Sequence, residues 1–154
     1  MATGARIGEE TTALTDVVAR LRRALRRSIR TDYPWESMPM ARVELMQVLA
    51  ERGTARVGEL AQVQLLAPNT VSGLVQQLVD AGLAVRQVDP TDRRASVISL
   101  TDHGVDQLRR WERANETRIA AALGTLTDGQ QAAIRRALPA LAALVDRLNE
   151  RDRT

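Results

Sequence analysis

The chain has 154 residues, of which 44% are hydrophobic, so it is long enough to bury one hydrophobic core. It contains no cysteine, which excludes disulfides, zinc-thiolate sites and thiol-based redox sensing. No apolar run approaches the roughly 20 residues of a membrane span, and the first residues lack the pattern of a secretion signal, so we expect a cytoplasmic protein. The 22 basic residues, all of them arginine, outnumber 19 acidic ones and favour a polyanionic partner.

Because the net charge is only +3, nucleic-acid binding requires that the arginines be clustered, and they are. One group lies within residues 20–30, and a second consists of Arg86, Arg93 and Arg94. A solvated helix face also explains the first group.

An amphipathic helix is predicted over residues 12–31, because apolar residues recur there at helical spacing and arginines fill the other face. The ten or so residues before it and the tail RDRT are expected to fray. Two prolines end this helix near TDYPWESMP, and a second helix then carries apolar residues from Val43 to Leu49 and ends at Gly53.

A pair of short helices joined by a tight turn is predicted next. The first covers about residues 57–63, and the second begins near Pro68, which suits a first helical turn. Its apolar residues, with Val71 and Leu78 among them, should face inward, and Gly82 should cap its C-terminus.

After Gly82 the apolar period changes from about 3.6 residues to 2, which predicts an antiparallel hairpin of two short strands within residues 83–100. The turn DPTDRR forms its tip and carries the two adjacent arginines. Two helices follow, a long one over residues 101–125 with Thr101 as N-cap and another over 126–150 that opens on a Thr-x-x-Gln capping box. Pro139 should kink the last helix or shift its start.

Two short helices followed by a hairpin predict a winged helix-turn-helix, a fold that places its second helix in the DNA major groove and its wing in the adjacent minor groove. An arginine on a rigid ribbon can enter a narrow minor groove at little entropic cost. Asp92 should pin the guanidinium of Arg94 through a charge-assisted pair and leave Arg93 for a phosphate. A solvated turn whose charges only improve solubility is the alternative.

The stretch AGLAVRQVDPTDRRASVISLTDHG resembles the wing signature of the MarR family of bacterial transcriptional regulators: Gly-Leu-Val, Asp-Pro-x-Asp-x-Arg and Leu-Thr-x-x-Gly. The resemblance extends over about residues 14–148. It implies a homodimer built by the terminal helices, DNA binding through the helix near 68–80 and the wing, and often release by a small ligand. On the wing pattern, the minor-groove arginine falls on Arg94 and its orienting aspartate on Asp92.

The chain departs from the family at the helix-turn-helix turn, where Leu-Gly-Leu-Ser is replaced by Gln64, Leu65, Leu66 and Ala67. No arginine or lysine lies between Arg56 and Arg86, so base reading must rest on neutral groups, and Asn or Gln can pair with adenine through two hydrogen bonds. The predicted DNA-binding residues are Pro68, Asn69, Thr70, Ser72, Gly73, Gln76, Gln77, Arg86, Asp92, Arg93 and Arg94. Gly73 would admit the DNA backbone closely, or is simply a tolerated surface glycine.

The terminal helices each present an apolar stripe that needs a partner, which predicts a homodimer. The predicted dimerisation residues are Leu14, Val17, Leu21, Leu138, Leu141, Val145 and Leu148. A small anionic aromatic ligand is predicted near Tyr33 and Trp35, with Arg26 and Arg30 as its charge partners, although ordinary packing also explains the two aromatic residues.

Catalysis finds no support in the sequence. The single histidine, His103, cannot furnish a zinc site of the usual kinds, and no phosphate loop or nucleophile elbow is present, so we expect no enzyme activity, metal or cofactor.

The predicted protein is a single domain over residues 1–154, mainly α with a small β-hairpin wing, in which a winged helix-turn-helix lobe (38–100) is joined to a helical dimerisation stem. Its predicted function is that of a ligand-responsive homodimeric repressor that binds double-stranded DNA at a pseudo-palindromic operator. A helical protein–protein adaptor without specific DNA binding is the alternative.

Overall fold

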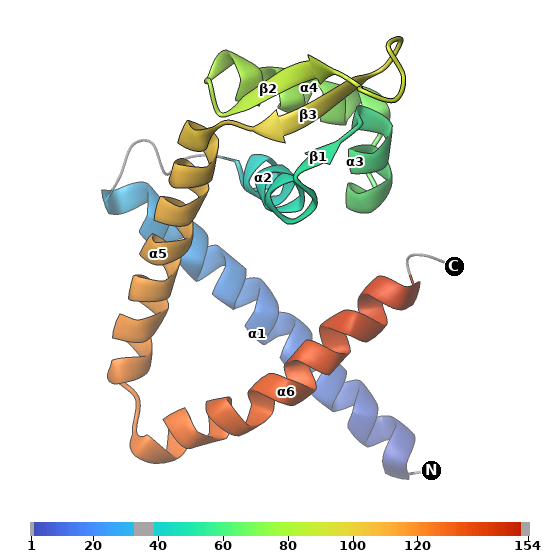
Figure 1. The fold of residues 1–154 in the computed structure, drawn as a ribbon. Helices are drawn as coiled ribbons and strands as arrows, with labels where there is room; N and C mark the ends of the chain where they lie inside the picture. Colours follow the sequence, from blue (N-terminus) through green and yellow to red (C-terminus); the bar gives the residue numbers. More distant parts are fainter. Residues whose placement is uncertain (1, 33–38, 152–154) are drawn as a thin grey trace. The chain divides into compact units, whose positions relative to one another are not determined.

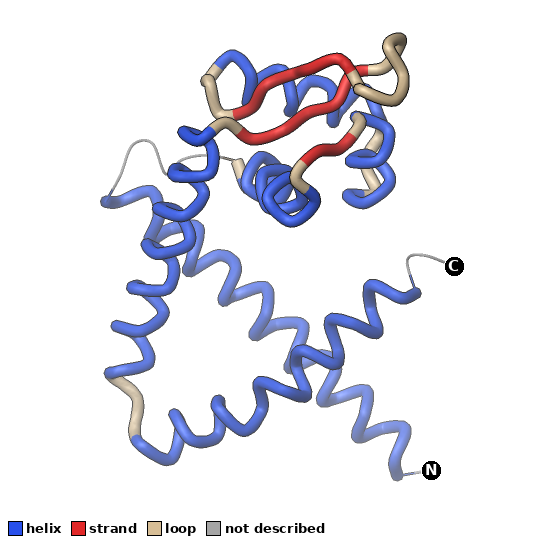
Figure 2. Tube along the Cα trace, in the orientation of Figure 1, coloured by secondary structure: helices blue, strands red, loops and turns tan. Residues whose placement is uncertain are grey.

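The computed structural model describes residues 2–32 and 39–151, with the side chains of residues 7–25 and 39–150. These residues form six helices and three short strands (Figures 1 and 2). They divide into two compact units, residues 1–115 and 116–154. The fold is mainly helical with a small antiparallel wing, as the sequence predicted.

The first helix, α1 (Ala2–Asp32), begins ten residues earlier than predicted, so the expectation of a frayed start was wrong. Ile7 lies two turns before Leu14 and extends the same apolar stripe toward the N-terminus. The hydroxyls of Thr11, Thr12 and Thr15 donate to carbonyl oxygens four residues back, so the helix itself satisfies these polar side chains.

Three helices form the centre of the winged helix-turn-helix lobe: α2 (Met40–Arg52), α3 (Val57–Gln64) and α4 (Pro68–Asp80). All three begin and end close to the predicted positions. Gly53 caps α2 with a φ of 77°, a conformation that suits glycine. Ala81 is the C-cap of α4, and Gly82, the predicted cap, is the next residue and has a φ of 70°. The largest fully buried side chains of the lobe are Leu45, Met46, Leu49, Leu60, Leu78, Ile98, Val43, Val71 and Val75.

A three-stranded antiparallel sheet completes the lobe. Strands β2 (Ala84–Val88) and β3 (Ser96–Leu100) form the predicted hairpin, and β1 (Thr54–Ala55) pairs with the other edge of β3. The sequence did not predict β1, because two residues are too few to show a strand period. The sheet therefore joins the wing to the segment that leads into α3.

Helix α5 (Asp102–Gly124) follows β3 directly. The hydroxyl of Thr101 accepts a hydrogen bond from the N–H of Gly104 at 3.0 Å, which confirms the predicted N-cap. The same hydroxyl donates to the carbonyl of Gly82, and the N–H of Thr101 donates to the carbonyl of Leu83. These bonds fix the start of α5 to the end of the α4–β2 connection.

Helix α6 (Asp128–Arg151) begins with the predicted capping box, in which the backbone N–H of Gln130 donates to the Thr127 hydroxyl and Gln130 Oε1 accepts from the N–H of Thr127. Pro139 lies inside this helix without shifting its start. One side of α6 carries exposed apolar residues, namely Ile134, Leu138, Leu141, Leu144, Val145 and Leu148. No described helix is long and apolar enough to cross a membrane.

Candidate nucleic-acid interface

Helix α4 has one apolar and one polar face, and the polar face is solvent-accessible. Val71, Val75 and Leu78 are completely buried, because they repeat at helical spacing toward the core. The opposite face carries neutral polar groups that can both donate and accept hydrogen bonds. Its exposed members are Asn69, Thr70, Gln76 and Gln77, and Ser72 is half-buried beside them.

Two residues of this face have distinct local features. The amide nitrogen of Gln76 donates to Oδ1 of Asp80, one turn later, at 2.8 Å, which leaves the second N–H and the carbonyl oxygen of Gln76 available. A Cβ built on Gly73 would have nothing within 4 Å, so the fold itself does not require glycine there.

The turn between α3 and α4 is made without the residues that such a turn favours. Leu65 adopts a left-handed conformation with φ 51° and ψ 39°, and it is the one described non-glycine residue with positive φ. Ala67 occupies the N-cap of α4 and offers no side-chain hydrogen bond, while Pro68 occupies the first turn.

The wing loop, residues 89–95, is held by hydrogen bonds beyond the end of the β2–β3 ladder. The N–H of Asp89 donates to the carbonyl of Ala95 at 3.0 Å, and the N–H of Ala95 donates to the carbonyl of Asp92 at 2.9 Å. Residues 90–94 are all exposed, so the guanidinium groups of Arg93 and Arg94 stand free of the core at the tip.

The predicted contact between Asp92 and the guanidinium of Arg94 was wrong. Oδ1 of Asp92 instead accepts the backbone N–H of Arg94 at 3.0 Å, because an aspartate two residues earlier readily closes a local Asx turn. Asp92 therefore shapes the backbone of the tip, and the ion pair of the wing lies elsewhere.

That ion pair joins Asp89 to Arg56. Oδ2 of Asp89 accepts Nε of Arg56 at 2.7 Å and also its Nη2, and Oδ1 accepts the N–H of Thr91 at 2.7 Å and its hydroxyl at 2.6 Å. The bonds from Thr91, followed by those from Arg56, hold the pKa of Asp89 well below its usual range. The same contact raises the pKa of Arg56.

Arg86 lies exposed on β2 opposite Ile98 of β3, so the lobe presents basic groups both along the strand and at the loop. The predicted DNA-binding residues thus occupy two parts of one lobe, the polar face of α4 and the wing. His103, the single histidine, is exposed in the first turn of α5, and Trp111 packs against the core.

The family profile that describes the MarR family matches residues 38–95, which include α2, α3, α4, β2 and the tip of the wing. The winged helix-turn-helix lobe is therefore of the MarR type. An HTH-type transcriptional regulator of Mycobacterium bovis is 26% identical over 122 residues, which cover 79% of this chain and 85% of that protein. Together with the helix-turn-helix of the structure, these two matches identify the protein as an HTH-type transcriptional regulator.

Solved structures agree with this assignment. A MarR family protein from Bacillus stearothermophilus is 26% identical, with a TM-score of 0.72 over 91% of this chain and 95% of that one. The RV1404 protein of Mycobacterium tuberculosis is 25% identical, with a TM-score of 0.77 over 91% and 94% of the two chains. A variant of MepR from S. aureus, 14% identical, shares the fold with a TM-score of 0.65 over 88% and 97%, and its structure holds an oligodeoxyribonucleotide.

Against the MarR turn pattern Leu-Gly-Leu-Ser, the structure gives Leu65 the place of the glycine and Ala67 the place of the capping serine. The left-handed φ of Leu65 and the N-cap position of Ala67 fix this correspondence. This lobe therefore keeps the turn geometry without the residues that normally stabilise it.

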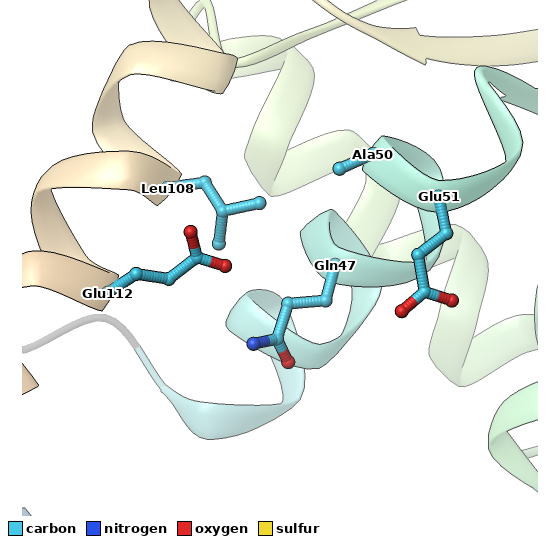
Figure 3. A pocket seen from close by; sticks show the side chains of 5 residues that line it. All are labelled: Gln47, Ala50, Glu51, Leu108 and Glu112. Carbon is cyan, nitrogen blue, oxygen red and sulfur yellow. The ribbon is translucent and has the colours of Figure 1, made fainter. Parts of the chain in front are cut away.

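A groove of about 380 Å³ lies in the same lobe between α2 and the first half of α5 (Figure 3). Leu108 and Ala50 supply apolar surface, and Gln47, Glu51 and Glu112 supply polar groups. The residues predicted to hold an anionic ligand do not contribute to it: Tyr33 and Trp35 lie outside the described residues, as do the side chains of Arg26 and Arg30.

Sequence reasoning missed Arg56 and Asp89, the most strongly bonded pair of the interface. The Asp-Pro-Thr order gives a weak signal for Asp89, because an aspartate often bonds the backbone two residues later. Nothing local identifies Arg56, since its partner lies 33 residues away.

Proposed function

We propose that this MarR-family regulator is a homodimeric repressor that binds a pseudo-palindromic DNA operator. In each subunit, α4 enters the major groove and the wing reaches the adjacent minor groove. The proposal for the dimer rests on the exposed apolar stripe of α6 and on the exposed Leu14, Val17 and Leu21 of α1, which water would otherwise cover.

The proposal of DNA binding rests on α4, which has a buried apolar face and an exposed face of neutral hydrogen-bonding groups. The wing, which carries the arginines, belongs to the same lobe. Asn69, Gln76 and Gln77 have the side chains that pair with adenine through two hydrogen bonds. The MepR variant that shares this fold is bound to an oligodeoxyribonucleotide, which supports the proposal.

The charge distribution assigns different contacts to α4 and to the wing. The described α4 carries one charged residue, Asp80, so it contributes hydrogen bonds and not phosphate neutralisation. Arg86, Arg93 and Arg94 would supply the phosphate and minor-groove contacts. Each phosphate contact steepens the fall of the logarithm of the binding constant with the logarithm of the salt concentration by about 0.9.

The test is selection of bound duplexes from a random DNA pool by the full-length protein. We expect a two-fold sequence whose half-sites lie about 10 base pairs apart, because two related α4 helices must meet the same face of the duplex. Arg94→Ala should weaken binding by about 1–3 kcal/mol. Gln76→Ala should relax base preference, whereas Gln62→Ala, on the neighbouring α3, should leave base preference unchanged. Absence of salt-sensitive DNA binding would favour the adaptor.

A small aromatic ligand that releases the operator remains part of the proposal. The groove in Figure 3 carries two carboxylates, Glu51 and Glu112, which disfavour an anion at that place. We propose instead that an anionic ligand binds near Arg26 and Arg30, which the sequence offers as its charge partners. Titration of the operator complex with salicylate and with a matched aromatic amine tests this: release by salicylate alone, lost in Arg30→Gln, supports the anionic ligand, and release by the amine alone rules against it.

A further inference from the structure

Asp89 is the one polar or charged residue that is buried among the residues the structure describes, and it is only 5% exposed. It stands at the first position of the wing loop, directly after β2. Both of its carboxylate oxygens are used: Thr91 bonds to one and Arg56 bonds to the other. The two partners come from different parts of the lobe.

Arg56 lies between β1 and α3, at the entrance to the helix-turn-helix. Its own backbone is fixed, because its N–H donates to Oε2 of Glu59 at 2.7 Å and its carbonyl accepts the N–H of Leu60 at 3.0 Å. The guanidinium donates to Asp89 through two nitrogens, which sets direction as well as distance. The pair therefore connects the first helix of the motif to the base of the wing loop.

The bonds of Asp89 divide into two roles. Those from Thr91 close a turn inside the loop and depend on nothing outside it. Those from Arg56 come from a residue 33 positions earlier in the sequence, so they attach the whole wing loop to the start of α3. Residues 90–94 are exposed, so no apolar side chain within them fixes the loop against the lobe.

We propose that Arg56 is a positioning residue for the wing, which holds Asp89 so that Arg93 and Arg94 stand at a fixed place relative to α4. This inference rests on the proposed DNA binding. Its consequence is that Arg56 controls the minor-groove part of recognition without touching a base. Without the guanidinium, the hydrogen bonds from Thr91 still close the turn of the wing loop, but the loop can move relative to α4. Arg93 and Arg94 then occupy the DNA minor groove for a smaller fraction of the time.

The experiment measures how affinity responds to minor-groove groups alone. In the duplex selected by the wild-type protein, adenines are replaced by 2,6-diaminopurine and guanines by inosine, one position at a time. These changes add or remove the amino group in the minor groove and leave the major-groove pattern unchanged. The ratio of affinities for modified and unmodified duplex is taken on one preparation, so a partly unfolded variant still gives a valid ratio.

We expect the wild-type protein to be sensitive to the substitutions under the wing, and Arg94→Ala to lose that sensitivity. Arg56→Gln should lose it too, with a fall in affinity of about 5- to 150-fold, similar to the loss of a minor-groove arginine. Arg56→Lys keeps the charge but not the two-pronged contact and should be intermediate. Arg109→Gln, which removes an exposed arginine of α5, is the matched control and should behave as wild type.

A double variant identifies the contact as the cause. Arg56→Gln combined with Asp89→Asn should lose no more sensitivity than the worse single variant, because both changes break one interaction. Retention of full wild-type sensitivity by Arg56→Gln and Arg56→Lys, while Arg94→Ala loses it, overturns the positioning role and leaves the proposed function intact. Failure of the wild-type protein to select any duplex overturns the proposed function itself.

Discussion

Gly104 of α5 packs directly against the backbone of Leu83. A Cβ on Gly104 would overlap the carbonyl oxygen of Leu83 and lie 2.9 Å from its carbonyl carbon. That carbonyl also accepts the N–H of Thr101, so it cannot turn away without breaking the start of α5. The glycine of the Leu-Thr-x-x-Gly pattern thus allows the first turn of α5 to pack against the backbone of the α4–β2 connection.

Gly104→Ala should therefore destabilise the protein severely, by about 3 kcal/mol or more, because the neighbour that must move is backbone. Urea unfolding followed by circular dichroism measures the change. Gly129→Ala, in the first turn of α6, is the control: a Cβ there meets nothing within 4 Å, and alanine should stabilise by roughly 0.5–1 kcal/mol. Equal stability of the two variants would show that the Gly104 contact is not required.

Leu65→Gly should stabilise the protein by roughly 0.5–1 kcal/mol. The left-handed conformation of Leu65 costs a side chain about 1–2 kcal/mol, and glycine avoids that cost while adding entropy to the unfolded chain. Little burial is lost, since Leu65 is 66% exposed. The adjacent Leu66→Gly lacks the positive φ and should destabilise instead, so a gain in both variants would argue against relief of strain.

The sequence predicted most of this fold because its signals are local. Helical spacing identified the buried face of α4 and hence its polar face, and Thr101 and the Thr127–Gln130 pair marked two helix starts. The missed features lack such signals: β1 has two residues, and Arg56 is far in sequence from Asp89. Asp92 was assigned the wrong partner because an aspartate two residues before an arginine can reach either its side chain or its backbone.

Acid should reveal the contribution of Asp89. Its pKa is lowered in the folded protein, so its contribution to stability is complete above the ordinary aspartate pKa near 4 and is lost as the pH falls toward the lower folded value. The free energy of unfolding of the wild type minus that of Asp89→Asn should be constant from pH 7 to about 5 and shrink below about 4. Urea titrations at pH 7, 5 and 3 measure it. A difference that already changes between pH 7 and 5 would be inconsistent with a lowered pKa.

Gly73→Ala separates a functional glycine from a tolerated one. The fold leaves open space at this position, so alanine should stabilise α4 by about 1 kcal/mol. If DNA approaches α4 closely there, the added methyl group should nevertheless weaken operator binding. Thermal unfolding and gel shift on the same preparation report the two effects. Higher stability with unchanged affinity would assign Gly73 to the surface and remove it from the interface.

The apolar stripe of α6 should be the dimer contact, and a charge placed in it should dissociate the protein. Leu141 and Val145 are 41% and 54% exposed in the single chain, and an arginine at either position would be buried without a partner in a dimer. Leu141→Arg and Val145→Arg should sediment near the chain mass of 16.9 kDa, whereas wild type should sediment near twice that mass. Both should lose operator binding, because a monomer offers one α4 to a two-fold site. Ala143→Arg adds the same charge on the opposite face of α6 and should remain dimeric; dissociation of this control as well would mean that the stripe is not the specific contact.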